Sequence, residues 1–189
     1  MTSRPARPRL TPLPRTEWSD EVRTMIERTP GGATEPLNIF TTLARHPALV
    51  RRWLPFGTVM LTGELPPRDR ELLILRTGWH CRSAYEWGQH ARIGLAAGLT
   101  QDEIDRVPAG PTAPGWAPFD AALLRAADEL HADGCVSDQT WTVLAGRYDE
   151  RQLIEVPMLV GQYHMVAFTL NSLGIQREPG VPDLPSRDS

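Results

Sequence analysis

Residues 65–98 read LPPRDRELLILRTGWHCRSAYEWGQHARIGLAAG, and we expect them to form the two central helices of the protein. The Pro66-Pro67 pair favours the start of a helix, because proline is well accommodated at a first helical position. We expect this helix to lose its regularity near Gly78 and a second helix to begin at Ser83. Apolar residues recur at helical spacing in the first helix and predict one buried face. They are Leu72, Leu75 and Trp79.

The second helix carries its own start signal. Ser83-Ala84-Tyr85-Glu86 fits the S-x-x-E capping box, in which the serine oxygen accepts a backbone N–H and the glutamate reaches back. The positions i, i+3, i+4 and i+7 then place Ser83, Glu86, Trp87 and His90 on one face. A hydroxyl, a carboxylate and an imidazole on one stripe suit a proton-transfer site, but a capped core helix with a buried histidine has the same pattern.

The rest of the chain is organised as one domain. Its 189 residues are enough to bury a substantial core, and 41% hydrophobic with 23% charged residues is ordinary for a globular protein. We predict a Pro/Arg-rich arm at 1–16, a single domain at 17–177 and a loose tail at 178–189. The arm either lies over a neighbouring subunit or is a flexible end. No segment shows sustained period-two alternation, so the predicted fold class is all-α.

Composition excludes several kinds of chemistry. All 20 basic residues are arginine, so the chain has no lysine for a Schiff base or for a Walker-type phosphate site. A net charge of −3 gives no reason to expect nucleic acid or a membrane surface as a partner. The N-terminus lacks the apolar core of a secretory signal, and no apolar run approaches the ~18 residues of a membrane span. We therefore expect a cytoplasmic protein.

Two cysteines, Cys81 and Cys135, lie far apart and form no C-x-x-C pair. Their arrangement suggests neither a disulfide framework nor a zinc site. Glu86 and His90 are one turn apart, as two metal ligands would be, with His80 as a third, but the conventional spacing is missing. We predict no metal and no cofactor.

Several motifs together resemble one known family. They are Glu71, Arg76, the Y-E-W-x-x-H of residues 85–90 and the G-L-T-x-x-E-I of residues 98–104. This combination resembles the carboxymuconolactone decarboxylase family, which includes the AhpD-like alkylhydroperoxidases. The resemblance implies an AhpD-like helical bundle with orthogonal helices, assembled as a homotrimer or homohexamer.

The AhpD branch of that family has the pattern E-x(11)-C-x-x-C-x-x-x-H. Here Glu71 and His90 have the right separation, but Ser83 and Glu86 stand where the cysteines would be. A peroxidatic dithiol needs a thiolate nucleophile and a second, resolving sulfur, and serine and glutamate supply neither. The resemblance therefore implies the non-redox branch, whose activity is cofactor-free decarboxylation of a muconolactone carboxylate.

The predicted site follows from that chemistry. We predict a cofactor-free carboxy-lyase acting on a small anionic or lactone-type substrate, with Glu71, Glu86 and His90 as its proton relay. In one straight helix Glu71 and His90 would be about 28 Å apart, at ~1.5 Å per residue, so the relay requires the chain to fold back near Gly78. The residues expected around the substrate are Arg76, Ser83, Tyr85 and Trp87, with Arg76 as a carboxylate clamp.

Two other functions remain open at this point. The first is a peroxidase that works through Cys81 and an external thiol. The second is a ligand-binding oligomer that kept the fold and has no catalytic activity. His131 and Cys135 are assigned no role, and His164 is only a weak candidate for the cavity wall.

Overall fold

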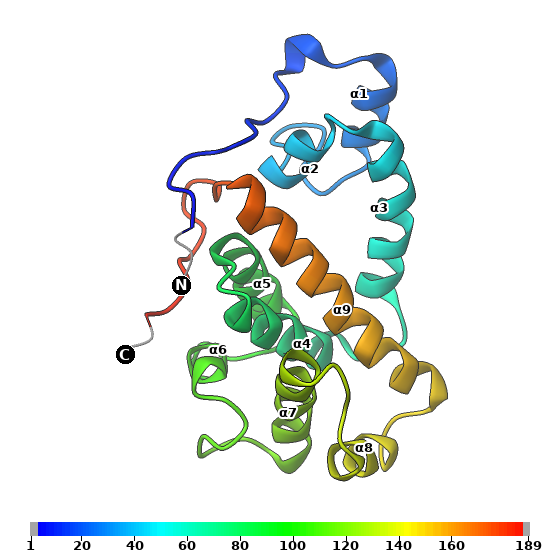
Figure 1. Cartoon of the computed structure of the whole chain (residues 1–189), viewed down its shortest axis with the longest axis vertical. Coiled ribbons are helices and arrows are strands. Elements are labelled where there is room, and N and C mark those ends of the chain that lie inside the picture. The colour runs from blue at the N-terminus through cyan, green and yellow to red at the C-terminus, as the bar shows by residue number, and fades with distance from the viewer. Residues whose placement is uncertain (1–3, 187–189) are drawn as a thin grey trace.

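The computed structural model describes residues 4–186 and is entirely helical over that range, which confirms the predicted all-α class (Figure 1). Two short 3₁₀ helices are η1 (Arg15–Glu17) and η2 (Val107–Ala109). The α-helices in chain order are α1 (Asp20–Glu27), α2 (Asn38–Leu43), α3 (Pro47–Thr62), α4 (Pro67–His80), α5 (Ala84–Ala96), α6 (Gln101–Arg106), α7 (Pro118–Ala132), α8 (Asp138–Ala145) and α9 (Glu150–Leu173).

Helix α4 lies at the centre of the molecule and packs against α5, α7 and α9. It is buried on all sides rather than on one face: Leu72, Leu73 and Leu75 are fully inaccessible to solvent. Burying each such side chain contributes about 1.5–3 kcal/mol. The same helix also buries Glu71 completely, so the central helix carries a carboxyl group into the core.

The predicted break between the two central helices is present. Helix α4 ends at His80, and its end is closed by backbone hydrogen bonds from Arg82 N to Trp79 O (3.1 Å) and from Ser83 N to Gly78 O (3.0 Å). This is the Schellman arrangement, in which the residue after the C-cap takes a left-handed conformation. Arg82 does so, with φ of 51°. The chain then folds back, and α5 runs beside α4.

The predicted capping box at the start of α5 is wrong. Ser83 is the N-cap residue, but its side chain accepts no hydrogen bond from a backbone N–H of α5. Its ψ angle is 91°. In the helices that a hydroxyl does cap, the ψ angle of the N-cap residue is 154–166°; these residues are Ser19, Thr100 and Ser137. The tight turn from α4 holds the Ser83 backbone away from a capping geometry. The Ser83 Oγ and both carboxyl oxygens of Glu86 are therefore buried without a hydrogen-bond partner among residues 4–186.

Helix α9 crosses the molecule and contacts α3, α4, α5, α7 and α8. Within the described residues it is the one helix long and apolar enough to cross a membrane by length and composition, with 24 residues and a mean hydropathy of 1.3. Fully buried positions such as Leu159 and Ala167 pack it into the core. Helices that pack in a protein core commonly have the same length and apolar composition, so packing in the core accounts for both properties of α9.

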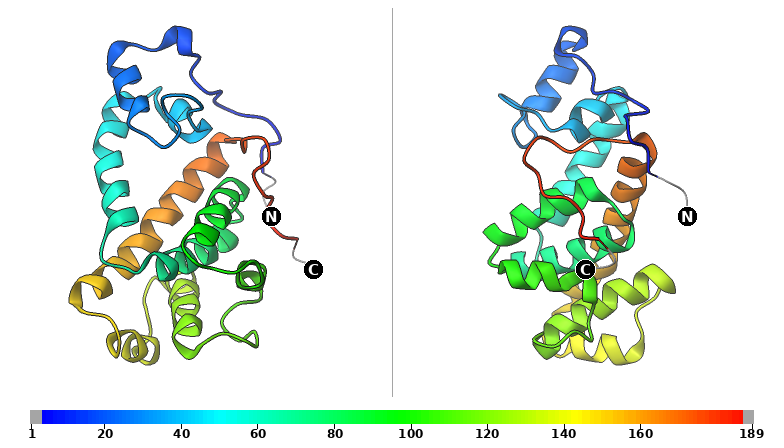
Figure 2. Two further views of the ribbon diagram at one scale, coloured as in Figure 1. Left: turned by 180° about the vertical axis from the view of Figure 1, so that it is seen from behind. Right: turned by 90° about the vertical axis from the view of Figure 1, so that its left-hand side faces the viewer.

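The terminal segments are attached to the domain (Figure 2). In the N-terminal arm, Arg9 N donates to Leu173 O (2.8 Å) at the end of α9. Of the tail predicted at 178–189, residues 187–189 lie outside the described residues. In the described part, the Glu178 carboxylate accepts hydrogen bonds from Tyr85 Oη (2.7 Å) and Gln89 Nε2 (2.5 Å). The close approach of Pro182 O and Val181 to Gly88 leaves no room for a side chain there, so residues 178–186 pack on α5.

Candidate functional site

The centre of the candidate site is a contact between Glu71 on α4 and His90 on α5. Glu71 Oε2 lies 2.7 Å from His90 Nδ1, although the two residues are 19 positions apart. The Glu71 side chain is fully buried and the His90 side chain is 10% exposed. Arg70 Nε lies 3.4 Å from the other carboxyl oxygen. The predicted fold-back is present and brings these two side chains together.

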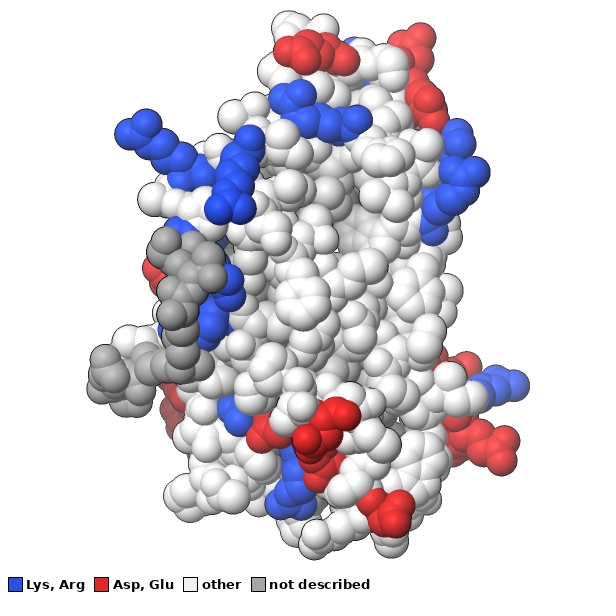
Figure 3. Space-filling view, in the orientation of Figure 1, with Lys and Arg blue, Asp and Glu red and all other residues white. Residues whose placement is uncertain are grey.

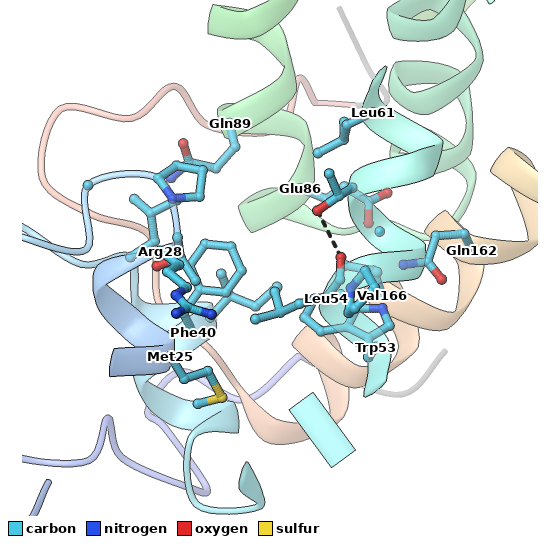
Figure 4. A pocket seen from close by; sticks show the side chains of 18 of the residues that line it. Met25, Arg28, Phe40, Trp53, Leu54, Leu61, Glu86, Gln89, Gln162 and Val166 are labelled. Atoms are coloured by element: carbon cyan, nitrogen blue, oxygen red, sulfur yellow. Dashed lines mark hydrogen bonds between the residues drawn. The ribbon is translucent and has the colours of Figure 1, made fainter. Parts of the chain in front are cut away.

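His90 faces a large cavity. The cavity has a volume of about 1390 Å³ and lies between α1, α2, α3, α5 and α9. Most of its wall is apolar, with Met25, Phe40, Leu54 and Val166 among the lining residues (Figure 4). Glu71 does not line the cavity itself; it lies behind His90 and holds the ring from the core side. An acid held behind an imidazole, with the ring facing a cavity, is an arrangement suited to general acid–base chemistry.

Glu86 lines the same cavity one helical turn before His90. Burial raises the pKa of its carboxyl group well above the ordinary value, because the charged form would be desolvated. Neither carboxyl oxygen has a hydrogen-bond partner within the described part of the chain. The raised pKa favours the protonated carboxyl group, which can donate one hydrogen bond to a molecule in the cavity.

Three polar side chains of the cavity wall were not predicted as site residues. Trp53 Nε1 and Gln162 Oε1 are buried in the described structure without hydrogen-bond partners. Tyr163 packs edge-on against His90 with ring centroids 4.8 Å apart, and burial, followed by the nearby Glu71 and Glu86 carboxyls, raises its pKa. The sequence contains a signal for Gln162 and Tyr163. The dipeptide Gly161-Gln162 repeats Gly88-Gln89, and the residues that follow the two dipeptides, Tyr163 and His90, are in contact.

Tyr85 lines the cavity, in agreement with its predicted position around the substrate. Its hydroxyl group, however, forms hydrogen bonds within the protein. It donates to Glu178 Oε1 at 2.7 Å and accepts from Ile39 N–H at 3.3 Å. Tyr85 thereby ties α5 to the start of α2 and to the C-terminal segment. Its ring contributes wall surface to the cavity, while its polar end holds the segments around it.

The other predicted substrate-binding residues lie elsewhere. Arg76 forms a two-point ion pair with Asp128 of α7, from Nε to Oδ1 (2.5 Å) and from Nη2 to Oδ2 (3.1 Å), and it also donates to the carbonyl oxygens of Val107 and Pro108. A guanidinium with these partners joins α4 to α7 and η2 and does not clamp a substrate in the cavity. Trp87 packs in the main core beside Trp79. Neither these two residues nor Ser83 lines the cavity.

The surroundings of Cys81 disfavour peroxidase chemistry through this thiol at neutral pH. Both cysteines are free. Burial, and then the nearby Glu86 carboxyl, raises the pKa of the Cys81 thiol to about 12, so the thiolate that peroxidase chemistry needs is scarce at neutral pH. Cys81 also lies outside the cavity wall. His80, considered with Glu86 and His90 for a metal, instead contacts Asp128, with Nε2 2.5 Å from Oδ1.

The fold and site define a class: a helical protein in which an acid and an imidazole from consecutive central helices meet beside an apolar cavity. Residues 47–129 match the family model of the carboxymuconolactone decarboxylase family. The predicted resemblance to that family is therefore confirmed over the segment that contains Glu71, Glu86 and His90. A comparison with functionally curated proteins gives no significant match.

Solved structures with the same fold extend over nearly the whole chain. A structure from Ralstonia eutropha JMP134, described as an alkylhydroperoxidase AhpD core and an uncharacterized peroxidase-related protein, superposes with a TM-score of 0.78 at 20% identity and covers 92% of this chain and 95% of its own. A peroxidase-related protein from Silicibacter sp. TM1040 gives 0.78 at 14% identity, with coverages of 96% and 97%. The debrominase Bmp8, in a variant complexed with 2,3,4-tribromopyrrole, gives 0.69 at 15% identity, with coverages of 90% and 91%. These likenesses establish the AhpD-like fold.

Proposed function

We propose that the protein is a cofactor-free lyase that moves a proton to or from a carbon atom of a small, largely apolar molecule bearing a carbonyl group, such as a carboxylated lactone. The contact of Glu71 with His90 beside the cavity carries this proposal. Glu71 accepts from Nδ1–H and so directs the Nε2 atom of His90 away from the core. An imidazole fixed in this way can give and take a proton at one defined nitrogen.

The proposed reaction is decarboxylation. The bond between the carboxylate carbon and the ring breaks, CO₂ leaves, and the electron pair is delocalised toward the substrate carbonyl oxygen. The neutral carboxyl group of Glu86 donates a hydrogen bond to that oxygen as its negative charge develops. The protonated His90 ring then delivers its proton to carbon, and the resulting neutral imidazole is protonated again by solvent.

The charge distribution around the cavity suggests the orientation of the substrate. The buried residues of the cavity wall include Glu86, His90 and Gln162, and within the described chain no buried arginine lines the cavity. The arginines of the cavity wall, Arg28, Arg51 and Arg92, all have exposed side chains. In Figure 4, Arg28 lies well apart from Glu86 and Gln162. A neutral carbonyl end therefore suits the buried side, and a remaining anionic group suits the arginine side.

The proposal is tested by incubating the purified protein with carboxymuconolactone and with a panel of neutral and carboxylated lactones. We expect CO₂ release from at least one carboxylated lactone, with one solvent deuterium incorporated at carbon in D₂O. Binding of lactones without any turnover would overturn the lyase and favour the non-catalytic ligand-binding oligomer. Hydroperoxide consumption that is lost in Cys81→Ser would favour the peroxidase instead, whereas the lyase predicts equal, background rates for both proteins.

Association of this chain with copies of itself is part of the proposal. Helix α9 exposes a row of large apolar side chains on one face, Ile154, Met158, Met165 and Phe168, which are 46–64% exposed. Figure 3 shows a broad area without charged residues across the face along which α9 runs. Apolar surface of this kind is stabilised by burial against a partner, and a second copy offers an identical row.

We expect the protein to have three or six times its 21.1 kDa chain mass in solution. Replacing both Ile154 and Met158 with glutamate should shift it to the monomer, because charges in a closed apolar interface are strongly destabilising. The measurement is light scattering coupled to size-exclusion chromatography. Trp141→Glu, at an exposed position on α8, is the matched control. A monomeric wild-type protein, or an assembly that persists in the double variant, would contradict this interface.

A further inference from the structure

Three potential metal ligands meet at a place that the proposed reaction does not use. Cys81 is the C-cap residue of α4, His131 lies in the last turn of α7, and His164 lies in the middle of α9. The Cys81 sulfur and one ring nitrogen from each histidine lie within 4.8 Å of one another. None of these residues lines the cavity that contains His90. The cluster therefore forms a separate site at the junction of three helices.

The histidine nitrogens are oriented as metal ligands would be. His164 Nδ1 lies 2.8 Å from the carbonyl oxygen of Val160, so it carries the proton and leaves Nε2 with a lone pair. A hydrogen bond from the second ring nitrogen to a backbone carbonyl is the usual support of a metal-binding histidine. His131 Nδ1 lies 2.9 Å from His164 Nε2, so the two candidate ligand atoms are adjacent.

The surroundings hold these groups in place. The His80 ring stacks on His131 with centroids 4.5 Å apart, and His80 is itself held by Asp128. The backbone of Cys81 is fixed through its carbonyl oxygen, which accepts from Arg4 Nη2 (2.7 Å) and Asn171 Nδ2 (2.8 Å). The site thus has buried and partly exposed ligands on rigid elements, with solvent reaching it from the side of His131, which is exposed.

We propose that Cys81, His131 and His164 bind a Zn²⁺ ion, with water as the fourth ligand. One sulfur and two imidazole nitrogens are ligands that zinc prefers, and a tetrahedral site accommodates all of them. On binding, the Cys81 thiol releases its proton to solvent as the Zn–S bond forms, and the His131 proton moves from Nδ1 to Nε2. Tetrahedral Zn–N bonds of ~2.0–2.1 Å place two nitrogens about 3.3 Å apart, so the two rings must separate by only a few tenths of an ångström.

A metal at this position would join α4, α7 and α9 at one point. Cys81 begins the turn that leads to α5, and His164 directly follows Tyr163 of the cavity wall. Zinc would thereby stabilise the arrangement of helices that carry the proposed site, without taking part in the reaction. This inference does not depend on the lyase activity.

Zinc binding is measured directly on the full, tag-free protein stripped with chelator. We expect one equivalent of Zn²⁺ in competition with a chromophoric chelator, and Co²⁺ should produce a thiolate-to-metal charge-transfer absorption. At a free Zn²⁺ concentration of roughly 100 times Kd, the thermal midpoint should rise by about 5–10 °C. The variants Cys81→Ser and His164→Gln should weaken Zn²⁺ binding by more than roughly 100-fold, since loss of a direct ligand costs more than loss of a supporting group.

Matched controls separate this site from nonspecific binding. Cys135→Ser removes the exposed thiol, and His46→Asn removes an imidazole at the start of α3, so both should bind Zn²⁺ as the wild type does. Unchanged Zn²⁺ affinity and Co²⁺ absorption in Cys81→Ser would overturn the proposal. Circular dichroism of each metal-free variant distinguishes loss of a ligand from loss of the fold.

Discussion

Replacing His90 with glutamine is expected to lower kcat for decarboxylation by about 10²–10⁴-fold with little change in KM, because the variant removes the proton carrier and keeps the cavity wall. Glutamine is preferred to alanine since its amide can donate to the buried Glu71 carboxylate, which would otherwise lose its hydrogen-bond partner. The rate of CO₂ release and the incorporation of solvent deuterium into the product measure the effect.

The matched control for the loss of an imidazole is His46→Asn. His46 is the N-cap residue of α3, where its ring accepts from Leu49 N, and asparagine preserves a capping acceptor. This variant should retain the wild-type kcat. Equal rates for wild type and His90→Gln, with the fold of both confirmed by circular dichroism, would remove His90 from the mechanism.

The variant Glu71→Gln tests whether the acid acts through His90. Glutamine retains an oxygen acceptor for Nδ1–H but removes the negative charge that stabilises the imidazolium form. We therefore expect kcat to fall, with KM nearly unchanged. A role confined to packing would lower stability and leave kcat unchanged.

The second large effect concerns stability and its dependence on pH. The pKa of Glu86 in the folded protein is raised by burial above its value in the unfolded chain, so the folded state retains a proton that the unfolded state releases. The free energy of unfolding of the wild type should therefore fall as pH rises from the ordinary glutamate value of about 4.3 toward the raised folded pKa, and it should level off above that. Within that window the slope for one group is about 1.4 kcal/mol per pH unit.

The variant Glu86→Gln removes this titration while preserving side-chain length. We expect wild type and variant to have similar dependence on pH below about 4.3, and the stability difference to widen in favour of glutamine as pH rises. Glu86→Leu should be more stable still, because it also removes a buried carboxyl group that lacks hydrogen-bond partners within the described chain, a cost of about 1–3 kcal/mol. Denaturant unfolding between pH 4 and pH 9 provides the measurement.

An exposed glutamate supplies the control for that series. Glu27→Gln on α1 changes the net charge by the same amount, and its unfolding curve should follow that of the wild type across the pH range. Parallel curves for wild type and Glu86→Gln would show that Glu86 does not gain a proton on folding. The stabilised variants should at the same time lose affinity or rate with the lactone substrate, since Glu86 donates to its carbonyl oxygen in the proposed reaction.

The sequence determined the features that depend on neighbouring residues. Helical spacing placed Glu86 and His90 on one face, and the Gly78–Ser83 region signalled the end of one helix and the start of the next. Thr100 and Glu103 also form a reciprocal capping box, as the T-x-x-E spacing of residues 100–103 favours. These outcomes follow from contacts within one or two helical turns, where residue type and spacing fix the geometry. The predicted break made a contact between Glu71 and His90 possible, and the packing of α5 beside α4 established it.

Only the tertiary structure decided which distant side chains meet. Arg76 pairs with Asp128, 52 residues away, rather than facing the cavity, and Ser83 fails to cap because the turn from α4 sets its backbone. Tyr163 joins His90 because α9 crosses α5, and the cluster of Cys81 with two histidines arises where three helices converge. Such pairings depend on how whole helices pack against a shared core, and the spacing of residues along one helix carries no information about that packing.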